Sequence, residues 1–188
     1  PYGRMAWILI LASVPAAVLG IALNDLFETL FTSPGITSVF LLLTGVLLVA
    51  GERWGRSHCA FERVKAGPAL LVGVAQGIAI APGISRSGAT ISVGRFVGLD
   101  RSDAARFSFL LAIPVIAGAG LVQLRHLSGT GELLNYGLPV ALGFLAALVS
   151  GYLVIRLLLN YVKRHSLWPF AIYCWAVGLI CLVIWVAR

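Results

Sequence analysis

The chain alternates long apolar runs with short polar connections. The apolar runs lie at about residues 6–23, 36–50, 107–124, 138–159 and 168–186. A helix of about 20 apolar residues crosses the hydrocarbon core of a bilayer, and about 17–25 is the usual range. The run at 36–50 is at the short end of that range. The pattern predicts an all-α, polytopic integral membrane protein, with five transmembrane helices in a single membrane domain spanning residues 1–188.

Residues 68–98 break this pattern. The segments 68–81 and 89–98 are apolar but too short to span a bilayer as helices, and polar and glycine residues separate them. Irregular backbone at membrane depth is tolerated only where protein buries it or water reaches it. We therefore favour a re-entrant helical hairpin over the alternative, one long kinked span with a buried arginine.

The distribution of basic residues agrees with a hairpin. Arg4, the segment 51–67 and the pair Lys163–Arg164 fall on one side if residues 68–98 enter and leave from that side. Cytoplasmic connections of membrane proteins carry an excess of lysine and arginine. We expect these basic segments to be cytoplasmic, and the acidic 24–35 connection and the polar 125–136 loop to be external.

Composition excludes an ordinary soluble domain. The chain is 60% hydrophobic and 11% charged, with a mean hydropathy of +0.97, whereas soluble domains are about 25% charged. A net charge of +7 would suggest nucleic acid in a soluble protein. Here the basic residues lie mainly between apolar runs, where they face anionic headgroups. We expect membrane lipids as partners and no nucleic acid. The three cysteines show no metal-binding spacing.

Polar residues cluster in the turn of the predicted hairpin. Its candidate ligands are Gly83, Ser85, Arg86, Ser87, Gly88 and Thr90, with Gln76 upstream. An arginine at membrane depth is costly and persists where an anion or a water-filled cavity compensates it. With a turn at 83–88 and a helix from Ala89, backbone N–H groups would point into the turn and favour phosphate. Arginine adds a fork of donors that suits phosphate oxygens. We interpret the turn as a phosphate site.

Structural roles are the alternative for several of these residues. Arg86 could be a buried arginine that binds carbonyls. Gln76 could bond across helices or reach the site, and the sequence favours neither. For Arg95, a position at a helix end or against headgroups is favoured over a ligand role.

A catalytic base is harder to find. Ser85 or Ser87 could act as a nucleophile, but a serine nucleophile needs an adjacent base. Asp100 and Asp103 are better placed to cap a helix. The histidines fall in polar loops, at positions 58, 126 and 165. From the residues alone, the turn is an anion site without a neighbouring base.

The motif PGISRSGATIS, with Gln76-Gly77 before it and FSFLLAIP after it, resembles the second signature of the undecaprenyl-diphosphate phosphatase family, also called the bacitracin-resistance protein family. LILASVPAAVLGI near the start and WPFAIYCW near the end resemble it too. The resemblance implies re-entrant hairpins and hydrolysis of undecaprenyl diphosphate to the monophosphate, which recycles the lipid carrier for cell-wall synthesis in the bacterial inner membrane. It implies that Ser85, Arg86, Ser87 and Thr90 bind the diphosphate, with Arg86 and Ser85 as catalytic candidates.

The chain departs from the family at its amino-terminal signature, a pair of glutamates followed by Pro-x-Ser-Ser and a histidine. Glu28 is followed by Ser33-Pro34-Gly35, which does not match. The resemblance implies a divalent cation, Mg²⁺ or Ca²⁺, whose ligands are not in this chain. We therefore expect a fragment that lacks the first catalytic motif and is weakly active or inactive alone.

Two other functions fit the same residues. A lipid-phosphate translocator would bind the headgroup without hydrolysis, since broken half-helices also suit alternating access. A structural membrane subunit would use Arg86 to hold a partner's carboxylate. The sequence leaves a homodimer open.

Overall fold

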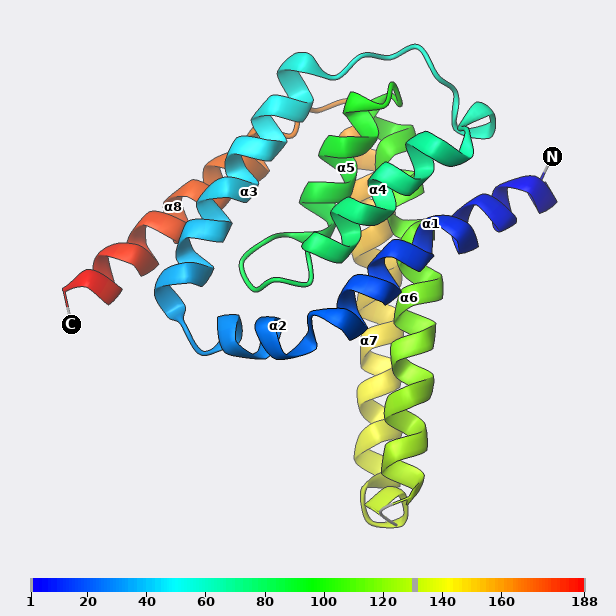
Figure 1. Cartoon of the computed structure of the whole chain (residues 1–188), viewed down its shortest axis with the longest axis vertical. Coiled ribbons are helices and arrows are strands. Elements are labelled where there is room, and N and C mark those ends of the chain that lie inside the picture. Colours follow the sequence, from blue (N-terminus) through cyan, green and yellow to red (C-terminus); the bar gives the residue numbers. More distant parts are fainter. Residues whose placement is uncertain (1, 130–131, 188) are drawn as a thin grey trace.

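The structure, a computed structural model of the chain, describes residues 2–129 and 132–187, with side chains placed for 3–125 and 137–187. This part of the chain is helical apart from its connections and one isolated β-bridge between Cys59 and Leu99. The helices are α1 (Tyr2–Ala22), α2 (Asn24–Phe31), α3 (Pro34–Trp54), a 3-10 turn (Phe61–Arg63), α4 (Ala66–Ile78), α5 (Arg86–Phe96), α6 (Arg101–Gly129), α7 (Glu132–Val162) and α8 (Trp168–Val186) (Figure 1).

Five of the described helices are long and apolar enough to cross a membrane. Their spans are Gly3–Ala22, Pro34–Trp54, Arg101–Arg125, Gly137–Val162 and Trp168–Val186. This confirms an all-α polytopic membrane protein. The second span is longer than the predicted 36–50 at both ends. It starts earlier because Ser33 caps α3 by accepting the Ile36 N–H and Pro34 fits the first helical turn.

The acidic connection at 24–35 contains a helix that the sequence analysis missed. α2 runs across one edge of the helical body between α1 and α3, short of the projecting ends of α6 and α7 (Figure 1). Phe27 is buried beneath it, while Leu26 and Phe31 are exposed. Asn24 donates to the Glu28 carboxylate over 2.8 Å on its polar side. A short helix of this kind suits the membrane–water interface, where one face can contact lipid.

α4 and α5 form a helical hairpin at the predicted position, and its entry and exit on one face of the membrane stay a prediction. They run side by side in opposite directions, and the turn between them lies within the body of helices rather than beyond it (Figure 1). One correction concerns its second arm, which begins at Arg86 and not at Ala89, with Ser85 as its N-cap. The first arm, α4, also ends earlier than predicted, at Ile78. The turn therefore lies earlier in the chain than predicted, at residues 79–85, and Arg86, Ser87 and Gly88 form the first turn of α5.

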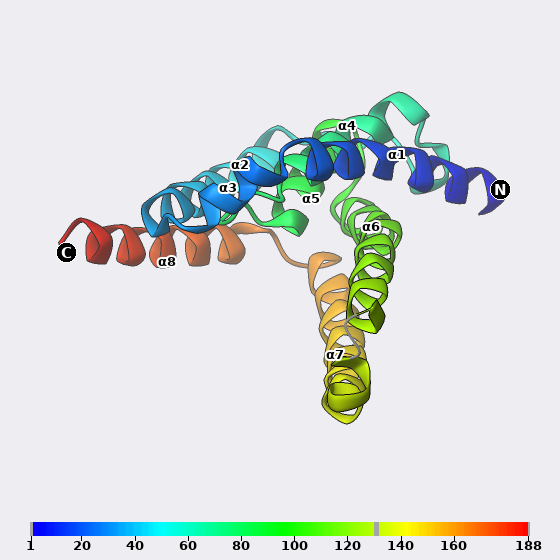
Figure 2. The same ribbon diagram turned by 60° about the horizontal axis from the view of Figure 1, so that its bottom comes forward.

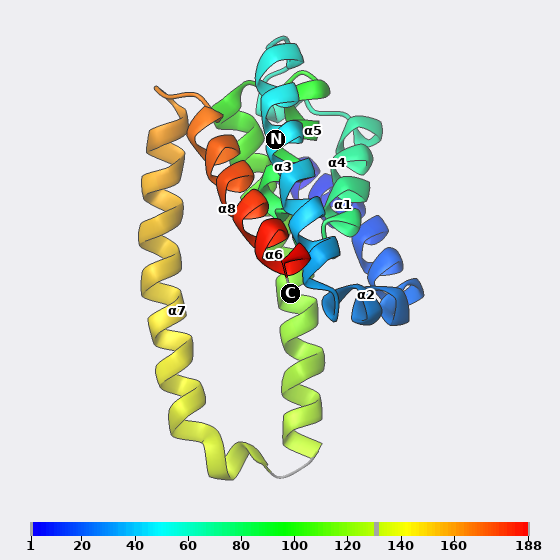
Figure 3. The same cartoon turned by 90° about the vertical axis from the view of Figure 1, so that its left-hand side faces the viewer.

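α6 also begins earlier than the predicted 107, at Arg101. Asp100 caps it by accepting the Asp103 N–H at 2.7 Å, so the predicted capping role of Asp100 is confirmed. α6 and α7 project together beyond the other helices (Figures 2 and 3). The predicted polar loop at 125–136 is helical where the structure describes it, and its side chains from 126 to 136, including that of His126, lie outside the described set.

Small residues let the helices approach closely around α4 and α5. A Cβ added at Gly73 of α4 would overlap the Ala12 carbonyl of α1. One added at Gly51 of α3 would lie 2.8 Å from the Cα of Ser92 in α5. Close approach through small residues replaces the hydrophobic driving force that is absent between helices in lipid. These contacts fix the hairpin between α1 and α3.

Polar contacts join the connections at the end of the molecule opposite α2. Glu52 at the end of α3 binds Arg101 at the start of α6, with N···O distances of 2.6 and 3.0 Å. Arg95 near the end of α5 is buried and donates to the carbonyls of Gly55 and Leu99. The predicted placement of Arg95 at a helix end is therefore correct, although the side chain is buried rather than open to headgroups.

We expect thiol labelling to place the connection after α3 and the connection after α7 on the same face of the membrane. With the native cysteines replaced by serine, Arg56→Cys and Arg164→Cys should react with an impermeant reagent from the same side of sealed vesicles. Glu28→Cys should react from the opposite side, since α2 lies at the other end of the molecule. Labelling of Arg56→Cys and Arg164→Cys from opposite faces would contradict the hairpin.

Candidate anion-binding site

The turn between α4 and α5 is held in place by one hydroxyl from α3. Thr44 is fully buried. Its Oγ1 accepts the Ser85 N–H at 3.0 Å and lies 3.2 Å from the Gly83 carbonyl, to which it can donate. The same proton can go to the Phe40 carbonyl within α3, at 3.1 Å. Thr44 thus supplies partners for the Ser85 N–H and the Gly83 carbonyl. Both groups lie in an irregular segment, where no helix or strand hydrogen bond would pair them.

Gly83 allows the chain to turn back. Its φ of +92° is readily adopted only by glycine. A Cβ there would also overlap the carbonyl of Thr37 in α3. The turn therefore needs glycine at position 83 both for its backbone conformation and for its close packing on α3.

The first turn of α5 presents free donors. The Ser85 Oγ accepts the Gly88 N–H at 3.1 Å, and the Ser85 carbonyl accepts the Ala89 N–H at 2.8 Å. The N–H groups of Arg86 and Ser87 have no acceptor in the part of the chain that the structure describes. Unpaired N–H groups at a helix start, with the helix dipole behind them, favour an anion.

Arg86 lies at this helix start and is half-buried. Its guanidinium makes no hydrogen bond or ion pair with any described residue, so neither carbonyls nor a carboxylate of the described chain compensate its charge. The Ser85 and Ser87 hydroxyls of the same segment lie 3.4 Å apart. Gly83, Ser85, Arg86, Ser87 and Gly88 thus lie in the turn and the first turn of α5, and their role as ligands stays a prediction.

Thr90 and Gln76 are placed differently. The Thr90 side chain is fully buried, and its Oγ1 lies 2.7 Å from the Arg86 carbonyl and 2.6 Å from the Ser108 Oγ of α6. Gln76 is buried and donates to the Leu111 carbonyl of α6 at 3.4 Å, while its Oε1 has no partner among the described residues. Both side chains tie the hairpin to α6, and neither contacts the turn hydroxyls through a hydrogen bond.

An apolar cavity of about 220 Å³ adjoins the turn. Ser85, Ser87 and Gly88 line it together with apolar side chains of α3, α7 and α8, among them Leu41, Leu48, Leu158, Phe170 and Tyr173. A cavity with hydroxyls at one side and aliphatic and aromatic walls suits an amphiphile with an anionic head.

Among the described residues, the turn contains no carboxylate or imidazole that could act as an acid, a base or a metal ligand. No cluster of three His, Cys, Asp or Glu side chains that could hold a metal ion occurs among the described residues. His58 and His165 are exposed, and Asp103 accepts the Phe61 N–H at 2.9 Å. Ser85 acts as a helix cap with no carboxylate or imidazole bonded to it.

Sequence reasoning missed Thr44 and Ser108. Each is a hydroxyl near or within an apolar run, and such residues commonly bond across membrane helices. That signal marks them as polar contacts but does not say which helix each one meets.

Comparison with known proteins identifies the family to which the chain belongs. Residues 1–180 match the family described as bacitracin resistance protein BacA. The chain belongs to the bacitracin resistance protein BacA family. The resemblance predicted from PGISRSGATIS is therefore confirmed.

BacA family members named undecaprenyl-diphosphatase resemble the chain over most of its length. One from Methanothermobacter thermautotrophicus is 47% identical over 92% of this chain and 96% of its own length. One from Methanosphaera stadtmanae is 40% identical over 98% and 66%, respectively. One from Rubrobacter xylanophilus is 42% identical over 95% and 65%. The chain thus spans nearly all of the first relative but just under two thirds of the other two.

We expect Thr44→Val to destabilise the turn, because it leaves the Ser85 N–H and Gly83 carbonyl without their partner. Loss of a partner for a buried polar group costs about 1–3 kcal/mol, and thermal unfolding in detergent measures this. Thr44→Ser keeps the hydroxyl and should stay close to the parent.

Thr37→Val is the matched control, since the Thr37 hydroxyl bonds only to the Ser33 carbonyl of its own helix. If Thr44→Val and Thr37→Val unfold at the same temperature, the Thr44 hydroxyl does not support the turn.

Proposed function

We propose that the turn binds the diphosphate of undecaprenyl diphosphate for hydrolysis to undecaprenyl phosphate and inorganic phosphate. The observation that carries the proposal is Arg86, half-buried and without a described protein partner, beside two free backbone N–H groups at the start of α5. Relatives of the chain bear the name undecaprenyl-diphosphatase, which supports the same substrate. The reaction recycles the lipid carrier used in cell-wall synthesis.

The proposed chemistry breaks one phosphoanhydride bond. An attacking oxygen bonds to the terminal phosphorus, and the bridging oxygen leaves with undecaprenyl phosphate. Arg86 and the N–H groups of Arg86 and Ser87 hold non-bridging oxygens and stabilise the charge of the transferring group. The Ser85 and Ser87 hydroxyls orient the same oxygens. The adjoining apolar cavity receives the first isoprenyl units of the lipid.

The residues of the turn do not fit a divalent cation. They offer N–H donors, hydroxyls and an arginine, whereas Mg²⁺ and Ca²⁺ require oxygen ligands that include carboxylates. We therefore assign no step of the reaction to a metal held by these residues. The proposal therefore requires that residues outside the turn supply both the cation ligands and the base.

The proposed location is the inner (plasma) membrane of a bacterium, where the lipid carrier is used. The five candidate spans and the basic connections support a multi-pass arrangement. A homodimer stays a prediction.

A translocator would bind the same headgroup without releasing phosphate. The names of the relatives give that alternative no support. It predicts movement of the intact lipid across sealed vesicles, so it can be tested beside hydrolysis.

We expect Arg86→Ala to weaken binding of undecaprenyl diphosphate and of its non-hydrolysable methylene analogue. Loss of hydrogen bonds to a charged group should weaken binding by about tenfold or more. The analogue reports on the turn whether or not a base is present. Where phosphate release occurs, with Mg²⁺ or Ca²⁺ added, the same substitution should lower its rate about 100-fold or more.

Two variants calibrate this test. Arg86→Lys keeps the charge but loses the planar fork, so its affinity should also fall. Arg53→Ala removes an exposed arginine at the end of α3 and should leave affinity unchanged. Equal affinity in the parent and Arg86→Ala would refute the proposed site, and lipid movement without phosphate release would favour the translocator.

A further inference from the structure

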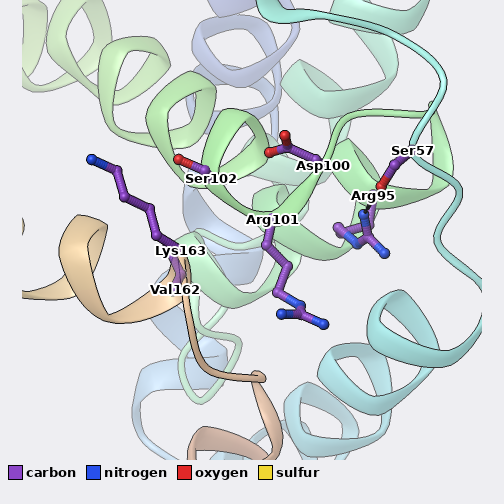
Figure 4. A pocket seen from close by; sticks show the side chains of 7 residues that line it. All are labelled: Ser57, Arg95, Asp100, Arg101, Ser102, Val162 and Lys163. Carbon is purple, nitrogen blue, oxygen red and sulfur yellow. Dashed lines mark hydrogen bonds between the residues drawn. The ribbon is translucent and has the colours of Figure 1, made fainter.

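A polar pocket, separate from the apolar cavity beside the turn, lies at the other end of α5. Its volume is about 320 Å³, and it is lined by Ser57, Arg95, Asp100, Arg101, Ser102, Val162 and Lys163. These residues come from the connection after α3, the end of α5, the start of α6 and the end of α7 (Figure 4). No part of the proposed hydrolysis uses them.

Arg95 is the unusual member of this pocket. Its side chain is only 7% exposed. Its partners are neutral: the Ser57 hydroxyl at 2.9 Å and the carbonyls of Leu99 and Gly55 at 3.0 and 3.1 Å. Among the described residues it forms no ion pair. A buried charge without a counter-charge is costly, so an anion in the pocket would compensate it.

Arg95 also has unused donors. A guanidinium carries five N–H groups, and the three hydrogen bonds above use three of them. Its Nε is buried without an acceptor in the part of the chain that the structure describes. Interaction with carbonyls alone therefore leaves part of this arginine unsatisfied, which a purely structural role does not explain.

The rest of the lining is mainly cationic. Arg101 is neutralised by Glu52. Lys163 is exposed, and in Figure 4 its side chain runs near Ser102 with the amine directed away from Arg95. The one carboxylate of the lining, Asp100, is directed away from the two guanidinium groups (Figure 4), and it is bonded to the Asp103 N–H as the cap of α6. The start of α6, a helix of 29 residues, adds the positive end of its dipole.

We propose that this pocket binds a phosphate-type anion through Arg95, with Lys163 as a second, flexible contact. The site is separate from the substrate turn, because α5 has 11 residues and is about 16 Å long at 1.5 Å per residue. Two sources carry such an anion at a membrane face: the headgroup of an anionic phospholipid and free inorganic phosphate. The bound anion ties the ends of α3, α5 and α6 to the end of α7.

The test follows thermal unfolding of the chain in phosphatidylcholine nanodiscs during titration with inorganic phosphate, against chloride at equal ionic strength. All samples carry Arg86→Ala, so that the turn does not contribute. We expect a saturable rise in the unfolding temperature with phosphate. Arg95→Lys should raise the half-saturating phosphate concentration about tenfold.

Lys163→Gln keeps the test valid if Arg95→Lys does not fold. Because Lys163 is exposed, its loss should raise the half-saturating concentration about two- to fivefold. The matched control is Arg164→Gln, a neighbouring exposed cation that does not line the pocket. It should leave the titration unchanged. Equal effects of Lys163→Gln and Arg164→Gln would overturn the proposal, because they would indicate general surface charge.

A second arm distinguishes the source of the anion. Phosphatidylglycerol replaces part of the phosphatidylcholine, with no phosphate added. A rise in unfolding temperature that Lys163→Gln reduces and Arg164→Gln does not would assign the site to a lipid headgroup. A response to inorganic phosphate alone would assign it to the free anion. No response in either arm would overturn the proposal.

Discussion

The hydrogen bonds between Thr44 and the α4–α5 turn are the constraint on which the site depends. A turn inside a membrane protein exposes backbone groups that lipid cannot satisfy. The Thr44 hydroxyl, buried in α3, accepts one of these N–H groups and can donate to a carbonyl of the same turn. With the backbone held in this way, the first amides of α5 remain free for a ligand. One hydroxyl on a neighbouring span thus holds a chain reversal in a shape that leaves the N–H groups of Arg86 and Ser87 without an acceptor among the described residues.

α3 supports the whole of α5, and not only its start. Gly51 allows close contact with Ser92, and the Gly55 carbonyl accepts a hydrogen bond from Arg95. Beyond α5, Glu52 binds Arg101 at the start of α6. The other arm of the hairpin packs on α1 through Gly73. The short half-helices are therefore positioned by full-length spans on both sides, which is how a rigid site can exist on segments too short to cross the bilayer.

The architecture could be predicted from the sequence because its signals are local. Run length predicts the five spans, and the broken run around Pro82 and Gly83 predicts the hairpin. The predicted start of α5 at Ala89 is three residues late, because Ser85 caps the helix and Arg86 begins it. Gly88 suggested the end of the turn, but it lies in the first turn of the helix. The contacts of Thr44 and Thr90 could not be predicted, because each joins segments far apart in the chain. Which helix a buried hydroxyl meets depends on tertiary packing and not on spacing.

Because α3 holds α5 at both ends, the number of residues in α3 between the two contacts is constrained. Thr44 meets the turn before α5, and Gly55 meets Arg95 near its other end. An α-helix turns by about 100° per residue. Inserting or deleting one residue of α3 between these two positions would rotate one contact away from α5 while leaving the other in place. The separation of the two contacts along α3 is therefore fixed by geometry, even where the side chains between them face lipid and are free to vary.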